Sequence, residues 1–176
     1  MATEQLKKVH NRITWRNLVR NTNNKFNSFI AGKKLGLVET EFIRYTDLEV
    51  FLEVDDMLSG ETQDVTFKLT NIGDLATVGN IVVIIGKPLV NNQANYGVDF
   101  VIPGSLPPGV TGVVQAASLR FTITSILQAK ESIEIPFTIE DLGLATETYA
   151  MQYIAGANNN EPNTDNNDKY VYYEVT

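Results

Sequence analysis

From Tyr45 onward the sequence alternates apolar and polar side chains with a period of two residues. In the first run the apolar positions are Leu48, Val50, Leu52 and Val54. Successive side chains of a β-strand point to opposite faces of a sheet, so this alternation predicts strands that bury one face and expose the other. A helix would instead need apolar positions three and four residues apart. The chain is therefore expected to be mainly antiparallel β-structure.

Further segments of the same kind follow, separated by turn-forming residues. They lie at 64–70, 80–86, 119–124, 132–139, 149–153 and 170–175. Short strands at this spacing, with no long helical pattern between them, predict an antiparallel β-sandwich. Segment 80–86 contains a continuous apolar run at 81–85 that is rich in β-branched residues, which favours a central strand. Pro136 has no amide hydrogen to donate, so its position is expected at a sheet edge or a bulge.

The first 45 residues differ from the rest of the chain in charge. They contain nine Lys and Arg and three Asp and Glu, whereas residues 46–176 contain five Lys and Arg and eighteen Asp and Glu. We therefore predict a basic N-terminal arm at 1–45 and a β-sandwich at 46–176. The arm is expected to be partly helical or extended, because Leu6, Val9 and Ile13 have helical spacing before asparagines interrupt the pattern.

Basic and aromatic side chains of the arm are its candidate docking residues. They are Lys7, Lys8, Arg12, Trp15, Arg16, Arg20 and Phe26. Trp15 lies among arginines, and tryptophan often anchors protein interfaces. The predicted partner is a protein in a larger assembly, including other copies of this chain. Nucleic acid is an alternative with less support, and an anionic membrane surface or a solvated tail stay open.

Signatures of catalysis, metal binding and cofactor binding are absent from the sequence. There is no cysteine, and the one histidine, His10, lies in the arm, which excludes a Ser-His-Asp triad in the sandwich. The Gly-Lys-Pro sequence at Gly86 lacks the pattern of a phosphate-binding loop. Two carboxylate pairs, Asp55–Asp56 and Glu140–Asp141, adjoin turns and are interpreted as solvated strand ends. We predict no enzyme activity, no catalytic residue, no metal ligand and no cofactor.

Residues 157–169 read ANNNEPNTDNNDK. Asparagine and aspartate favour turns because they hydrogen-bond their own backbone and tolerate left-handed angles. The stretch has neither the glycine nor the ligand spacing of an EF-hand loop. It is predicted to be the turn before the last strand, with calcium binding or recognition as the alternatives.

Several short motifs along the sandwich occur in a recognisable order. They are Gly60-Glu61, Asn71 with Gly73, Ala129 to Ser132, Asn160-Glu161 and Asn166-Asn167. In order and spacing they resemble the immunoglobulin-like repeats of bacterial surface proteins, namely the cell-adhesion-related bacterial domain and the conserved repeat domain. The resemblance covers residues 46–176 and implies an immunoglobulin-like antiparallel β-sandwich. Lys130 stands where those families usually carry a glycine.

The middle segment, 86–117, is long for a connection within a compact domain. It is interpreted as an insertion with one extra edge strand at 98–102, or alternatively as a contact surface. The candidate contact residues are Asn95, Tyr96, Pro103, Leu106, Pro107 and Pro108.

Tyrosines gather near the end of the chain. They are Tyr149, Tyr153, Tyr170, Tyr172 and Tyr173. Tyrosine is common in strands, so core or cross-strand packing is predicted, with a carbohydrate-binding platform as the alternative.

The sequence predicts a non-enzymatic structural or interaction protein, in which the arm attaches an immunoglobulin-like module to an assembly. No apolar run approaches the roughly 20 residues that span a bilayer, and no export signal is visible. A bacteriophage virion component, such as a capsid or tail decoration, would combine these features and would work on a virion or an extracellular surface. The alternative is a bacterial cell-surface adhesion or carbohydrate-binding module whose leader is missing.

Overall fold

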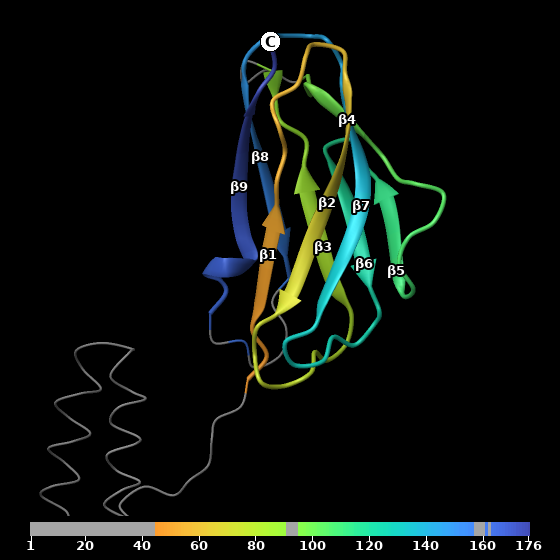
Figure 1. Cartoon of the computed structure of the whole chain (residues 1–176), viewed down its shortest axis with the longest axis vertical. Coiled ribbons are helices and arrows are strands. Elements are labelled where there is room, and N and C mark those ends of the chain that lie inside the picture. The colour runs from red at the N-terminus through yellow and green to blue at the C-terminus, as the bar shows by residue number, and fades with distance from the viewer. Residues whose placement is uncertain (1–44, 91–94, 157–160, 162) are drawn as a thin grey trace, which may run out of the picture. The chain divides into compact units, whose positions relative to one another are not determined.

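The computed structural model describes residues 45–90, 95–156, 161 and 163–176. The described residues form nine strands and one short 3-10 helix, η2, at Asp165–Asn167 (Figure 1). The strands are β1 Leu48–Leu52, β2 Thr62–Asn71, β3 Ile81–Gly86, β4 Val98–Val101, β5 Val110–Val114, β6 Ser118–Ile123, β7 Ser132–Asp141, β8 Thr148–Ala155 and β9 Asp168–Glu174. The predicted arm residues, from Lys7 to Phe26, lie outside the described part of the chain.

The strands form two antiparallel sheets that pack face to face (Figure 1). One sheet has four strands in the order β1-β2-β7-β4, and the other has five in the order β5-β6-β3-β8-β9. This arrangement is an immunoglobulin-like β-sandwich, which confirms the predicted fold class. Among the described residues, no helix has the length and apolar character that crossing a membrane requires.

The alternating apolar side chains fill the space between the two sheets. From Val65 along β2 and from Ile135 along β7 every second side chain is buried, and so is every second side chain along β8. The largest fully buried side chains are aromatic: Phe67, Phe121, Phe137, Tyr149 and Tyr173. Burial of this apolar surface is the main stabilising contribution to such a fold.

The segment after β1 leaves the four-stranded sheet and joins the other one. Leu52 is paired with Phe67 of β2, but Met57 forms a parallel bridge with Val175, just after β9. The amide nitrogen of Met57 donates to the carbonyl oxygen of Glu174 at 2.9 Å. The segment between Leu52 and Met57 therefore links the two sheets along one side. Because it leaves β2 at Phe67, the first half of β2 has no strand paired with it on this side.

The middle segment contains two strands rather than one. The predicted edge strand is confirmed as β4, which pairs with β7. The prediction of a single strand is wrong, because β5 pairs with β6 along its whole length. The sequence of β5, VTGVV, does not alternate and carries a glycine at its centre, so it lacked the period-two signal.

Pro136 lies inside β7, and the pairing explains why a proline is tolerated there. Just after β7, the amide of Leu142 donates to the carbonyl of Gly97, just before β4. Backbone groups of successive residues in an antiparallel strand point to opposite sides, so the backbone groups of the even-numbered residues of β7 face β4. Pro136 belongs to that set, but the last β4 residue paired with β7 is Val101, opposite Thr138. Pro136 thus faces an edge that β4 does not reach, as predicted.

The described part of the asparagine-rich stretch is a turn between neighbouring strands. It contains η2 and leads directly into β9, which pairs with β8. Residues 157–160 and 162 lie outside the described part. Oε1 of Glu161 accepts hydrogen bonds from the amide of Leu48 at 2.7 Å and from the side-chain amide of Asn167 at 2.9 Å. These bonds attach the turn to the start of β1.

Candidate functional site

The predicted contact residues of the middle segment lie at opposite ends of β4. Asn95 and Tyr96 precede the strand; the carbonyl of Asn95 accepts from Val90, and Tyr96 forms a bridge with Leu89. The other predicted residues follow the strand, and Leu106 packs against the hydrophobic core. The carbonyls of Pro107 and Pro108 accept hydrogen bonds from the amide of Val110 and the hydroxyl of Ser125, respectively, and Pro103 is partly buried. The six residues therefore occupy two separate turns rather than one surface loop.

The tyrosines divide into a buried set and an exposed pair. Tyr149, Tyr153 and Tyr173 belong to the hydrophobic core, as the packing prediction expects. Tyr170 and Tyr172 point outward from β9, with 54% and 66% of their surface exposed. Their ring centroids lie 6.4 Å apart with an angle of 24° between the ring planes. This pair lies on the outer face of the five-stranded sheet, so core packing is wrong for it.

We call this outer face the tyrosine face. The pairing of β8 with β9 sets Tyr170 opposite Gln152 and Tyr172 opposite Ala150. The Gln152 amide donates to Oδ1 of Asp168 at 2.9 Å, so hydrogen-bonding groups lie beside the rings. A groove of about 440 Å³ adjoins Tyr170, and its lining includes Tyr170, Gln152, Thr148, Glu147, Leu89 and Lys87.

Lys87 holds the wall of this groove in place. Its ammonium nitrogen lies 2.7 Å from Oδ1 of Asp99, and only 8% of its side chain is exposed. It also lies 5.9 Å from the centroid of the Phe100 ring, in range of a cation–π interaction. The hydrogen bond from Lys87 lowers the pKa of Asp99, and the backbone amide of Phe100 adds to the effect. Asp99 is therefore ionised at neutral pH.

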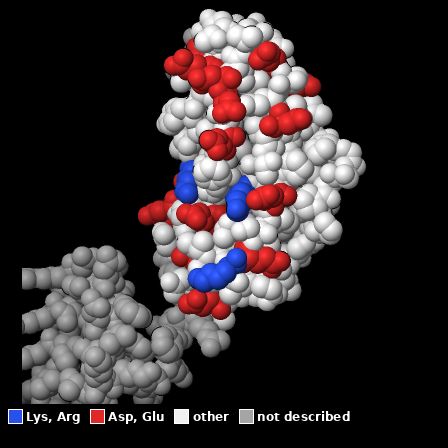
Figure 2. Space-filling model, viewed as in Figure 1, with Lys and Arg blue, Asp and Glu red and all other residues white. Residues whose placement is uncertain are grey.

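The outer face of the four-stranded sheet differs in being acidic. Figure 2 shows Asp and Glu side chains spread over it, with few Lys or Arg among them. Its outward carboxylates include Glu49, Glu53, Asp55, Asp64, Glu134 and Glu140. A groove of about 620 Å³ lies on this face, between β2 and the segment that leaves it after β1.

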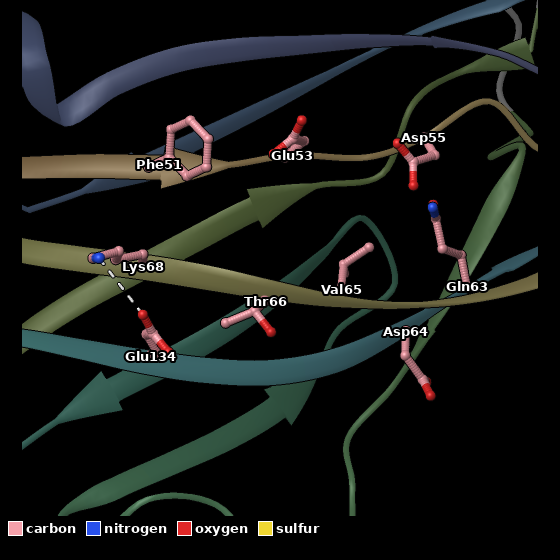
Figure 3. Close-up of a pocket in the computed structure, with 9 residues that line it drawn as sticks. All are labelled: Phe51, Glu53, Asp55, Gln63, Asp64, Val65, Thr66, Lys68 and Glu134. Atoms are coloured by element: carbon pink, nitrogen blue, oxygen red, sulfur yellow. Dashed lines mark ion pairs between the residues drawn. The ribbon is translucent and has the colours of Figure 1, made fainter.

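We call this second depression the β1–β2 groove. Its lining includes Phe51, Glu53, Asp55, Gln63, Asp64 and Glu134. Figure 3 shows Phe51 on β1, Glu53 and Asp55 on the departing segment, and Gln63 on β2 pointing toward Asp55. Lys68 lies 3.5 Å from Oε1 of Glu134 across the β2–β7 boundary. Sequence reasoning missed this groove, although Phe51 occupies a polar-side position of an alternating strand and could have drawn attention.

Carboxylate, amide and hydroxyl side chains line both grooves. Among the described residues, no three His, Cys, Asp or Glu side chains are grouped to hold a metal ion. The clear pKa shifts concern Asp99 and three tyrosines, whose pKa values are raised mainly by burial.

Comparison with known proteins gives structural neighbours but no sequence relative. Neither a protein-family model nor a curated protein matches the chain. A CARDB domain from Pyrococcus furiosus, solved in complex with di-metal ions, is 14% identical, with a TM-score of 0.49 over 79% of this chain and 95% of that chain. A non-cellulosomal cohesin from Archaeoglobus fulgidus is 14% identical, with a TM-score of 0.45 over 74% and 91% of the two chains.

A third neighbour is the carbohydrate-binding module CBM3b of cellobiohydrolase 9A from Clostridium thermocellum. It is 14% identical, with a TM-score of 0.42, and the match covers 65% of this chain and 93% of that chain. At identities this low, the three similarities concern the arrangement of strands. Function has to be inferred from the surfaces of this chain itself.

Proposed function

We propose that this protein is a non-catalytic binding module that attaches to a polysaccharide at an extracellular surface through its tyrosine face. The observation that carries this proposal is the exposed, stacked pair Tyr170 and Tyr172. Aromatic side chains have a large apolar surface, and leaving this surface in water is unfavourable. Two exposed aromatic rings side by side therefore indicate a surface that binds a partner.

The chemistry of the tyrosine face fits a sugar chain. A sugar ring has an apolar face of C–H groups that packs on an aromatic ring, and hydroxyl groups around its rim. On the neighbouring strand, Gln152 lies opposite Tyr170 and Thr148 lies opposite Glu174, so the groove offers an amide and a hydroxyl for those sugar hydroxyls. The strands hold these groups on a rigid sheet, so little conformational entropy is lost on binding.

The tyrosine pair and the adjoining groove together form an extended contact surface. The two tyrosines are two residues apart on one strand, and their centroids lie 6.4 Å apart. The groove beside Tyr170 continues across β8 toward Lys87 and Leu89, which extends the surface away from the strand. A polymer with repeated units can contact the pair and the groove together, and each added contact strengthens binding.

The other reading of the sequence, a bacteriophage virion component, has no specific support in the described residues or in the comparisons. It stays a prediction, as does the absence of enzyme activity. A cell-surface adhesion or carbohydrate-binding role is supported by a defined surface, and we therefore prefer it.

Binding to a panel of polysaccharides tests the proposal. Purified full-length protein would be run through gels containing soluble polysaccharides and sedimented with insoluble cellulose, chitin and peptidoglycan. We expect retention by at least one polymer and a loss of affinity of about tenfold or more in the Tyr170→Ala/Tyr172→Ala variant, since each stacking contact contributes on the order of 1 kcal/mol.

The matched control is Val101→Ala, which truncates an exposed apolar side chain of β4 in the other sheet, outside both grooves. This variant should bind the polysaccharide as the unchanged protein does. Lack of binding to every polymer, or an equal loss in both variants, would contradict the proposed function.

A further inference from the structure

The β1–β2 groove exists because β2 is longer than its neighbour. The last residue of β1, Leu52, pairs with Phe67, whereas β2 begins at Thr62. The chain then crosses to the other sheet, where Met57 bridges Val175. Residues 62–66 of β2 therefore pair with β7 on one side, and β1 does not reach them on the other.

The hydrogen-bond pattern shows which backbone groups face the groove. The amide of Ile72 donates to the carbonyl of Asp47 on the β1 side, and the amide of Asp141 donates to the carbonyl of Glu61 on the β7 side. Because the two sides alternate along an antiparallel strand, the N–H and C=O groups of Thr62, Asp64 and Thr66 face the side that β1 has left. A strand edge of this kind readily accepts another chain.

The side chains around this edge select for positive charge. Glu53, Asp55, Asp64 and Glu134 line the groove with Lys68, which gives it a formal charge of −3. Glu134 and Lys68 form an ion pair, and the other three carboxylates have no cation within the groove to match them. A polyanion would be repelled from this groove, whereas a basic segment would gain several charge-assisted hydrogen bonds.

An apolar contact lies at the end of the same groove. Phe51 points outward from β1, with 52% of its surface exposed, and lines the groove beside the carboxylates. The ideal ligand therefore combines lysine or arginine side chains with at least one aromatic or aliphatic side chain.

We infer that the β1–β2 groove binds the basic N-terminal segment, residues 1–44, of a second copy of this chain. That segment carries nine Lys and Arg against three Asp and Glu, and its Trp15 stands between Arg12 and Arg16. Charge and apolar content thus match the groove, while the remainder of the chain is acidic.

The inferred contact is heterologous, because a segment of one copy binds a groove of another. Each copy retains a free segment or a free groove after one such contact, so the contacts continue into a ring or an open filament. Binding also leaves the tyrosine face of the other sheet uncovered. Self-assembly would therefore raise the number of polysaccharide sites per particle and their combined affinity.

Charge reversal in the full-length protein tests this inference. The groove variant is Glu53→Lys/Asp55→Lys/Asp64→Lys, and the segment variant is Arg12→Glu/Arg16→Glu/Arg20→Glu. Sedimentation velocity at about 20 mM and about 500 mM salt would measure association over a range of protein concentrations, since salt screens such contacts. We expect the unchanged protein to associate at low salt and to dissociate at high salt.

The two variants give a complementation test. Each alone should sediment as a monomer, because one lacks an acidic groove and the other lacks a basic segment. Their mixture should form a limited 1:1 complex, since the segment of the groove variant still fits the groove of the segment variant. A monomeric unchanged protein at about 100 µM and low salt, or a mixture that stays monomeric, would overturn the inference.

A matched control separates groove chemistry from total charge. The variant Asp74→Lys/Asp165→Lys/Glu174→Lys changes the net charge by the same amount at exposed positions that do not line the groove. It should associate as the unchanged protein does. Equal loss of association in this control would mean that net charge alone, and not the groove, controls assembly.

Discussion

The ammonium group of Lys87 lies 2.7 Å from Oδ1 of Asp99, between β3 and β4. Lys87 is nearly covered, whereas about half of the Asp99 side chain is exposed. An Asp99→Asn variant would leave the covered ammonium without its counter-ion. We expect the free energy of unfolding to fall by about 1 to 2 kcal/mol, measured by urea denaturation, because a buried charge that loses its partner is destabilising.

The same pair predicts how stability depends on pH. The hydrogen bond from Lys87 lowers the pKa of Asp99 in the folded protein below its unfolded value of about 3.9. The stability that Asp99 contributes is therefore complete above about pH 4 and is lost as the pH falls through the folded pKa. The Asp99→Asn variant should lose less stability than the unchanged protein between about pH 5 and pH 2. Parallel curves for the two proteins would contradict this assignment.

Asn71 joins three segments at one end of the sandwich, and its side chain is fully buried. Its amide nitrogen donates to the carbonyls of Leu75, Leu127 and Gln128, and its Oδ1 accepts from the amide of Gly73. Replacement by alanine removes these bonds from the buried end of the sandwich. The carbonyl of Leu75 loses its donor, whereas the carbonyls of Leu127 and Gln128 keep the backbone amides of Thr77 and Glu131. We expect Asn71→Ala to lower the free energy of unfolding by about 2 to 4 kcal/mol.

A control for Asn71 is Thr66→Ala, an exposed position on the same strand. That change should stay within about 0.5 kcal/mol in thermal or urea unfolding. A loss for Asn71→Ala no greater than for Thr66→Ala would contradict the role of Asn71 as a buried hydrogen-bonding centre.

Lys130 has a positive φ of 67° where related repeats are expected to carry glycine. A residue with a Cβ is strained in this left-handed region, by about 1 kcal/mol relative to glycine. Lys130 also pairs with Asp74 at 3.5 Å, but both side chains are well exposed, so this ion pair contributes little. We expect Lys130→Gly to be more stable than Lys130→Ala by about 1 kcal/mol in urea unfolding. Equal stability of the two variants would show that the backbone is not strained there.

The hydroxyl of Tyr173 is buried and has no hydrogen-bond partner among the described residues. Burial, together with the nearby Tyr149 and Asp141, raises the pKa of Tyr173 far above its ordinary value. The folded protein therefore keeps Tyr173 neutral when the unfolded chain ionises, so the protein loses stability as the pH rises above about 10. Tyr173→Phe should be at least as stable as the unchanged protein at pH 7 and should lose less stability between about pH 9 and pH 11. A loss of more than about 1 kcal/mol at pH 7 would point to a bound partner for the hydroxyl.

Much of the fold follows from local sequence. Alternation places Val50, Phe67 and Phe137 in the core and marks β2 and β7 as strands, but the pairing of these two strands is seen only in the structure. It fails for β5, because Gly112 and the adjoining valines break the pattern at a sheet edge. Local patterns report on a strand only when its two faces differ in polarity.

The candidate surfaces were harder to predict, for a related reason. In β9 tyrosines occur at both even and odd positions, so the sequence does not say whether Tyr172 or Tyr173 faces the core. The packing of β8 against β9 decides this, since Tyr173 lies opposite the buried Tyr149. The β1–β2 groove likewise depends on where β1 leaves β2, which is a tertiary property with no local signal.

The central claim, that Tyr170 and Tyr172 bind sugar, is tested most directly by NMR of protein labelled in its tyrosine rings. An oligosaccharide from a polymer that retains the protein would be titrated into the full-length chain. We predict that the ring signals of Tyr170 and Tyr172 shift and saturate together, while those of Tyr149, Tyr153 and Tyr173 stay unchanged. Saturable binding that leaves the signals of Tyr170 and Tyr172 unchanged would contradict the account.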